Sequence, residues 1–198
     1  MNSGEAAGAT TTAPPHIVLV GLMGAGKSCI GRRLAARLKR PFLDADTEIE
    51  KAAGCSIPEI FERHGEEAFR DGERRVIERL LRSDEPHIIA TGGGAYMDAA
   101  TRSAIARRGL AVWLKADLEV LLRRTARRDN RPLLKQGDPR QILSELIERR
   151  HPSYGLADLT VESQDGPPEV TVERVLQALR KGGYLTQENS KGERLGRS

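Results

Sequence analysis

The sequence predicts an α/β fold built on one five-stranded parallel sheet with helices on both faces. Short aliphatic runs alternate with longer segments in which apolar residues recur every three or four positions, a pattern typical of buried strands joined by amphipathic helices. The first aliphatic run leads into GLMGAGKS at 21–28, a glycine-rich turn of the kind that joins a strand to a helix. At 198 residues, the chain is long enough for one domain and short for two.

The elements follow from these patterns in chain order. The five aliphatic runs predicted as strands are 16–20, 41–45, 87–91, 111–115 and 159–161. A helix is predicted at 27–39, because Ile30, Leu34 and Leu38 are spaced four residues apart. Two short helices are predicted at 47–53 and 57–64, and a long one through Phe69, Val76, Ile77 and Leu80. The remaining helices are predicted at 98–108, 118–128, 140–150 and 168–179.

The two ends of the chain differ in composition from the part between them. Residues 1–15 and 183–198 are small or polar, so we expect a disordered N-terminal extension and a polar C-terminal tail around a domain at 16–182. Residues 1–15 lack the regions of a secretory signal, and no apolar run is long enough to cross a bilayer. Cys29 and Cys55 have no metal-binding spacing and are expected to be reduced. These features predict a cytoplasmic protein without a membrane partner.

The charge pattern argues against a nucleic-acid partner. The net charge is +4, but the basic residues are interleaved with acidic ones along the predicted helices. The composition includes only three Phe, three Tyr and one Trp, and these are spread along the chain rather than grouped with basic residues. We therefore expect a charged, solvated surface and small anionic ligands.

The glycine-rich turn at 21–28 has the form G-x-x-x-x-G-K-[ST], which binds nucleotide phosphates. Gly21, Gly24 and Gly26 allow backbone N–H groups to curl around phosphate oxygens. The following helix adds the positive end of its dipole. Lys27 is expected to reach the β and γ phosphates, and the Ser28 hydroxyl to bind Mg²⁺. The turn predicts ATP or GTP with Mg²⁺ and leaves hydrolase, switch, motor and kinase open.

Two carboxylates follow the second predicted strand, where open α/β sheets bind their ligands. Alternation along an extended strand would point Asp44 and Asp46 to the same side. One of them is expected near the metal, and the other is a candidate to accept a proton from an acceptor hydroxyl. Asp46 or Thr47 as a simple helix cap is the alternative interpretation.

Glycine and arginine residues complete the candidate site. The third strand ends in TGGG at 91–94, where backbone can approach a ligand closely. Arg70 lies one helical turn before Glu73, which would orient its guanidinium. Arg131 lies in RRDNRPLLKQGDPR, a basic stretch with two prolines that predicts a mobile loop over a site, and Arg150 precedes HPSY. The four histidines show no metal-ligand spacing, and we assign them no chemistry.

Together these residues resemble the shikimate kinase family, over about 16–180 of the chain. Six motifs occur in that family's order: GLMGAGKS at 21–28, FLDAD at 42–46, F-R-x-x-E at 69–73, TGGG at 91–94, RPLL at 131–134 and R-x-P-x-Y at 150–154. The resemblance implies a three-layer P-loop fold like that of nucleoside monophosphate kinases, with a mobile lid at about 123–140. It also implies transfer of the ATP γ-phosphate to the 3-hydroxyl of shikimate, a step in chorismate and aromatic amino-acid biosynthesis.

The resemblance further implies the role of each matching residue. Asp46, Lys27 and Arg131 look like catalytic residues, with Arg131 on the lid. The implied shikimate contacts are Asp46, Arg70, Gly92, Gly93, Gly94 and Arg150, the two arginines holding the carboxylate. The implied ATP contacts are Gly21, Gly24, Ala25, Gly26, Lys27, Ser28, Cys29, Arg124, which would stack on adenine, and Arg131. Ser28 and Asp44 resemble the residues that hold Mg²⁺, and similar kinases are monomers.

Two other functions remain open at this point. A gluconate-type kinase shares the phosphate loop and the small-kinase fold, although the triple glycine and R-x-P-x-Y argue against it. A nucleotide-binding regulator that has lost catalysis would be expected to lack Lys27, Asp46 or Arg131, and all three are present. A coupled assay of ADP release with each acceptor distinguishes these possibilities.

Overall fold

The computed structural model describes residues 16–126 and 137–185. Five strands form a single parallel sheet in the order β2-β3-β1-β4-β5. Their bounds are β1 His16–Val20, β2 Phe42–Asp44, β3 Ile88–Ala90, β4 Gly109–Lys115 and β5 Leu159–Glu162. The helices are α1 Lys27–Leu38, α2 Ala45–Ala53, α3 Ile57–Leu80, α4 Ala99–Arg108, α5 Leu118–Ala126, α6 Pro139–Tyr154 and α7 Pro168–Lys181, with a 3₁₀ turn η1 at Ala95–Met97.

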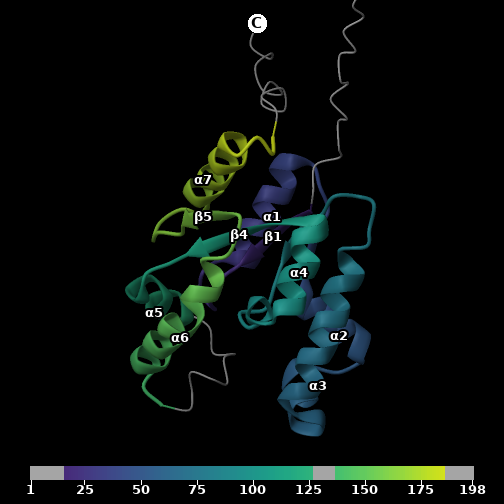
Figure 1. The fold of residues 1–198 in the computed structure, drawn as a ribbon. Helices are drawn as coiled ribbons and strands as arrows, with labels where there is room; N and C mark the ends of the chain where they lie inside the picture. Colours follow the sequence, from purple (N-terminus) through teal and green to yellow (C-terminus); the bar gives the residue numbers. More distant parts are fainter. Residues whose placement is uncertain (1–15, 127–136, 186–198) are drawn as a thin grey trace, which may run out of the picture.

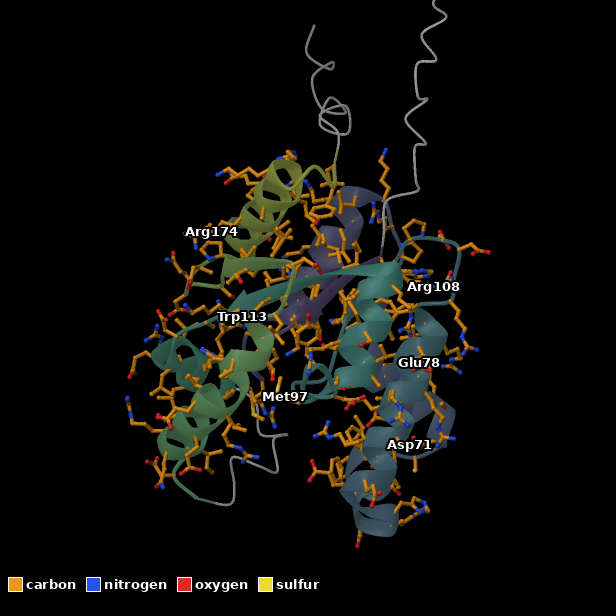
Figure 2. The ribbon with its side chains drawn as sticks, viewed as in Figure 1. Asp71, Glu78, Met97, Arg108, Trp113 and Arg174 are labelled. Carbon is orange, nitrogen blue, oxygen red and sulfur yellow. The ribbon has the colours of Figure 1, made fainter. Side chains whose placement is uncertain are left out.

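The sheet lies between two layers of helices, as the alternating pattern predicted (Figure 1). Helices α1 and α7 pack together over one face, and α4 packs on β4 over the other. This division follows from right-handed crossovers, because α1 leads from β1 to one side of the sheet and α4 leads from β3 to the other. Figure 2 shows Trp113 toward the middle of the molecule, while Arg174 lies on α7 near its edge.

The strand order also predicts where a ligand binds. β1 and β3 are neighbours, but the chain leaves them toward opposite faces of the sheet. A crevice therefore opens at their carboxyl ends, which is where open α/β sheets hold their ligands. The phosphate loop (residues 21–28) and the glycine loop (residues 91–94) begin there.

Several element bounds differ from the predicted ones. β2 ends at Asp44, and α2 begins at Ala45 rather than at Thr47. The two expected helices at 57–64 and after it form one span, α3, interrupted by the non-helical backbone of Gly65. α6 continues past Arg150 and through Pro152 to Tyr154. The expected end of α5 at 128, the lid motif at 131–134 and both chain ends lie outside the described residues.

Burial follows the strands. The central strands β1, β3 and β4 are almost wholly buried, which explains their continuous aliphatic runs.

No helix among the described residues is long and apolar enough to cross a membrane.

Candidate active site

The phosphate loop joins the end of β1 to the start of α1. Gly21, Gly24 and Gly26 have φ values of 138°, 83° and 95°, which side chains with a Cβ rarely adopt. Gly26 is the N-cap of α1 and offers no side-chain hydrogen bond to the first turn. The free N–H groups of that turn and the helix dipole make this a site for an anion such as phosphate.

Lys27 folds its side chain back over the phosphate loop. Its Nζ donates hydrogen bonds to the carbonyl oxygens of Gly21 at 2.7 Å and Leu22 at 3.0 Å. These contacts hold a positive charge beside the anion site. The predicted pairing of Lys27 with phosphate is consistent with this position.

Ser28 and Asp44 meet between α1 and α2. The Ser28 hydroxyl donates to Asp44 Oδ2 at 2.6 Å, while Asp44 Oδ1 accepts from the backbone N–H of Asp46 at 3.2 Å. Asp44 is thus the N-cap of α2. The alternative interpretation correctly included a helix cap here, but it assigned the cap to Asp46 or Thr47, which was wrong. Hydroxyl and carboxylate oxygens are the ligands that Mg²⁺ prefers, and the pair fits a magnesium site completed by phosphate and water.

The expected geometry of the Asp44 and Asp46 pair was also wrong. Asp46 lies in the first turn of α2 and not on an extended strand, so alternation along a strand does not orient it. The reason is that Asp44 caps the helix, so β2 ends at Asp44, one residue before the predicted end at 45. Asp44 nevertheless contacts the phosphate loop through Ser28, and Asp46 lies beside the glycine loop, because a Cβ on Gly92 would stand 2.9 Å from Asp46 Oδ1.

Arg124 and Ser163 form hydrogen bonds with the phosphate loop and with each other. Arg124 Nη1 donates to Ser163 Oγ at 2.9 Å, and the buried Ser163 hydroxyl donates to the carbonyl oxygen of Ala25 at 2.9 Å. Arg124 Nη2 also donates to the carbonyl oxygen of Gln164 at 2.5 Å, in the loop after β5. Arg124 therefore joins the phosphate loop to the loop at 163–167. Ser163 carried no sequence signal of its own, since a single serine after a strand is common.

Cys29 lies in the first turn of α1, directly after Ser28. Arg33 Nη1 donates to Cys29 Sγ at 3.0 Å, and Arg33 also pairs with Glu169 on α7 at 2.8 Å. Arg33 therefore links Cys29 on α1 to α7, and Cys29 is a free cysteine. Among the described residues, no cluster of three or more His, Cys, Asp or Glu side chains could hold a metal ion by itself.

Arg70 lies against the glycine loop. A Cβ on Gly94 would stand 2.5 Å from Arg70 Nη1 and 2.7 Å from Arg70 Cζ, so only glycine allows the guanidinium this close. Arg70 Nη1 donates to Glu73 Oε2 at 2.7 Å, as the spacing of the two residues predicted. Its Nη2 and Nε lie 3.3 and 3.4 Å from Glu66 Oε1.

Glu73 is the most buried carboxylate of the site. Burial raises its pKa, and the negative charge of Asp46 adds to this effect, while the ion pair with Arg70 lowers it. Its Oε1 has no hydrogen-bond partner among the described residues and lies 2.7 Å from the place of a Cβ on Gly92. Glu73 therefore holds the guanidinium of Arg70 in position. It also places a negative charge near Asp46.

Arg150 and Tyr154 hold the other side of the glycine loop. Both donate to the carbonyl oxygen of Gly93, Arg150 from Nη1 at 2.8 Å and Tyr154 from its hydroxyl at 2.5 Å. Tyr154 is fully buried, and burial raises the pKa of its hydroxyl to about 12, so it remains a donor. Its ring stacks on Trp113 at 5.8 Å between centroids. The sequence motif included Tyr154, but this support of the glycine loop was not predicted.

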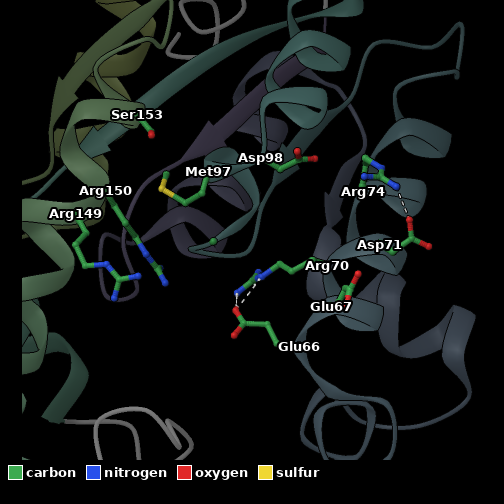
Figure 3. Close-up of a pocket in the computed structure, with 11 residues that line it drawn as sticks. Glu66, Glu67, Arg70, Asp71, Arg74, Met97, Asp98, Arg149, Arg150 and Ser153 are labelled. Atoms are coloured by element: carbon green, nitrogen blue, oxygen red, sulfur yellow. Dashed lines mark hydrogen bonds and ion pairs between the residues drawn. The ribbon is translucent and has the colours of Figure 1, made fainter.

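A cavity of about 650 Å³ lies between α3 and α6. Figure 3 shows Arg70 and Arg150 reaching into it from opposite walls, with Glu66 beside Arg70. Gly94 is part of its floor, and a Cβ on the adjacent Gly93 would stand 3.5 Å from the backbone nitrogen of Met23 in the phosphate loop. The cavity thus offers two guanidinium groups to an anionic molecule. Gly93 separates the cavity from the phosphate loop.

The structure brings together nearly all of the predicted site residues. Short contacts connect the phosphate loop, Asp44, Asp46, Arg70, the glycine loop and Arg150, and Arg124 contacts the phosphate loop at the carbonyl oxygen of Gly24. Arg131 lies outside the described residues.

The sequence of this chain is similar to those of known shikimate kinases. A model of the shikimate kinase family matches residues 23–180. The shikimate kinase of Paramagnetospirillum magneticum is 61% identical over 163 residues, which cover 82% of this chain and 83% of that protein. That of Caulobacter vibrioides is 58% identical over 165 residues, covering 83% and 82%.

Solved structures show the same relationship. The shikimate kinase from Acinetobacter baumannii in complex with shikimate matches with a TM-score of 0.80 at 42% identity, over 85% of this chain and 94% of that one. A gluconokinase from Sinorhizobium meliloti matches with a TM-score of 0.60 at 20% identity, over 85% and 93%, which shows a shared fold alone. The matched length, the identity and the six ordered motifs agree, and the chain belongs to the shikimate kinase family.

Proposed function

We propose that this protein is an ATP-dependent shikimate kinase, which transfers the γ-phosphate of ATP to the 3-hydroxyl of shikimate. One observation carries the proposal beyond family membership. Arg70 and Arg150 face a common cavity beside a glycine loop that contacts the phosphate loop. Two guanidinium groups suit a carboxylate, and the adjacent phosphate loop suits the γ-phosphate.

On the nucleotide side, the phosphate loop would bind ATP through the backbone of residues 21–28 and the Lys27 ammonium. Ala25 lies in this loop, and Cys29 follows it in the first turn of α1. Arg124, fixed by Ser163, would lie along the adenine. Ser28 and Asp44 would hold Mg²⁺, which supplies charge neutralisation on the phosphates when bound.

On the acceptor side, we assign Arg70, Arg150 and the backbone of Gly92, Gly93 and Gly94 to shikimate. Asp46 would accept the proton of the 3-hydroxyl while the hydroxyl oxygen forms a bond to the γ-phosphorus. The bond between the γ-phosphorus and the oxygen that leaves with ADP breaks in the same step. Glu73 lies nearby, where burial and the negative charge of Asp46 raise its pKa.

Arg131 is assigned to the transferring phosphate on the strength of the matching RPLL motif. Arg131→Ala should lower turnover more than shikimate affinity, because a charge on the phosphates acts mainly in the transition state. We also propose that the protein is cytoplasmic and acts as a monomer. Light scattering of the purified protein tests the monomeric state.

A coupled ADP-release assay tests the function directly. It is run with shikimate, with gluconate and with no acceptor, at fixed ATP and Mg²⁺. ADP release should depend on shikimate. Release that depends on gluconate instead favours the gluconate-type kinase, and release that is unchanged without any acceptor contradicts both kinase assignments.

A further inference from the structure

We infer that Glu66 competes with the carboxylate of shikimate for one edge of Arg70, and so sets the affinity for this substrate. The inference rests on the proposed function, which assigns Arg70 to that carboxylate. Glu66 lies outside the motif at 69–73, and its proposed role concerns substrate affinity rather than phosphate transfer.

Two other parts of the Arg70 guanidinium contact the protein. Nη1 donates to Glu73 Oε2 at 2.7 Å, and Gly94 lies against the plane of the group. The edge formed by Nε and Nη2 faces Glu66 Oε1 at 3.4 and 3.3 Å. An Nε/Nη2 edge is one that can bind a carboxylate through two parallel hydrogen bonds. Glu66 therefore lies where a substrate carboxylate would form this pair.

The two glutamates that contact Arg70 differ in how easily they can leave. The side chain of Glu73 is 3% exposed and that of Glu66 is 70% exposed. Exposed ion pairs contribute little to stability, whereas a buried carboxylate depends on its partner. One oxygen of Glu66 makes both contacts, and each lies at the long end of the hydrogen-bond range. A bound carboxylate with two oxygens can displace Glu66 while Glu73 keeps the guanidinium in place.

The break in α3 explains how Glu66 comes to lie there. Gly65 has φ 78° and ψ 177°, and the helix resumes at the next residue, four positions before Arg70. Residues at this spacing lie on the same face of a helix, so Glu66 and Arg70 meet at the wall of the cavity. Figure 3 shows Glu66 and Arg70 joined there, apart from Arg149 and Arg150 on the facing wall.

Glu66→Gln tests the inference, with Glu67→Gln as its matched control. Both residues line the cavity on α3, and each substitution removes one negative charge. The Kd for shikimate, measured by calorimetry, should fall about two- to fivefold in Glu66→Gln, the range that an exposed ion pair allows. The KM for shikimate should fall in parallel with kcat unchanged. Glu67→Gln should leave both constants at the wild-type values.

Further measurements separate competition from its alternatives. Shikimate methyl ester, which lacks the carboxylate, should gain less affinity than shikimate from Glu66→Gln. An equal gain for the ester, an equal effect of Glu67→Gln or weaker shikimate binding by Glu66→Gln would each overturn the inference. If the wild type shows no shikimate-dependent ADP release, the proposed function itself fails. If the wild type uses shikimate and Glu66→Gln binds it unchanged, only the role of Glu66 fails.

Discussion

The hydroxyl of Ser28 donates a 2.6 Å hydrogen bond to Asp44, so the end of the phosphate loop is tied to the end of β2. Asp44 also caps α2 through its other oxygen. One carboxylate therefore has a structural contact and a proposed metal contact at once. Two substitutions can separate these two roles.

Asp44→Asn keeps an acceptor for the helix cap but removes the negative charge. We expect the Mg²⁺ concentration for half-maximal rate to rise about 10- to 100-fold, as is typical when groups that support a metal are changed. Thermal unfolding should change little, because asparagine is as good an N-cap as aspartate. Asp44→Ala should have the same metal defect and lose ~1 kcal/mol of folding free energy as well. An unchanged Mg²⁺ requirement in both variants contradicts the assignment.

Asp46→Asn tests the proposed proton acceptor. It should lower kcat on the order of 10²-fold or more while ATP binding, measured by calorimetry, remains close to that of the wild type. Glu48→Gln is the matched control, because Glu48 lies in the same first turn of α2 but pairs with Lys51. The assignment of Asp46 fails if its turnover stays within about threefold of the wild type, since general acid–base catalysis is worth far more.

How far the site could be predicted from sequence depended on whether a contact is local. The conformation of the phosphate loop was predicted correctly because the positive φ angles of its glycines and the contacts of Lys27 with Gly21 and Leu22 are local in the chain. Asp46 was placed on a strand because FLDAD alternates like one, and only the capping bond of Asp44 shows that the helix starts there. Ser163 contacts the phosphate loop from a distance of 138 residues, so no local pattern could reveal it.

The extent of α6 shows the same limit. A helix was predicted at 140–150, and Pro152 after it removes a backbone donor and disfavours continuation of the helix. The helix instead continues to Tyr154, whose hydroxyl is bonded to Gly93 and whose ring is buried against Trp113. Tertiary packing outweighs the local preference of proline, and it also places Tyr154 under the glycine loop. The roles of Arg131 and of the rest of the lid motif remain predictions.

Gly94→Ala tests the close approach of Arg70 to the glycine loop. Gly94 has an ordinary φ of −102°, so the substitution acts only through the new Cβ, which would stand 2.5 Å from Arg70 Nη1. We expect the guanidinium to move and the KM for shikimate to rise about tenfold or more, the equivalent of one charge-assisted hydrogen bond. The KM for ATP should change much less.

Gly72→Ala is the control for that substitution. Gly72 lies inside α3, and a Cβ there would meet nothing within 4 Å. Alanine is the better helix former by about 1 kcal/mol, so this variant should unfold at a higher temperature with unchanged KM. Equal KM values in Gly94→Ala and the wild type would show that the glycine does not position Arg70.

The last prediction concerns His16, at the opposite end of β1 from the site. His16 is buried, its Nδ1 accepts from the backbone N–H of His87 at 3.1 Å, and its Nε2 lies 3.1 Å from the carbonyl oxygen of Ser83. Both nitrogens are thus satisfied only in the neutral ring with the proton on Nε2. Burial lowers the pKa of His16, and the nearby His87 and Arg108 lower it further.

A histidine whose pKa is lower in the folded state takes up its proton more readily when unfolded, so the stability of the fold falls as pH falls. The contribution of neutral His16 should be fully present above its usual pKa of about 6.5 and should decrease as pH drops below that value. Urea unfolding of the wild type at pH 7.5 and 5.5 measures this loss. His16→Gln, which cannot take up a proton, should lower stability at pH 7.5 but show a smaller difference between the two pH values. His64→Gln, at an exposed position, should keep the wild-type difference, and an undiminished difference in His16→Gln would assign the pH dependence to other groups.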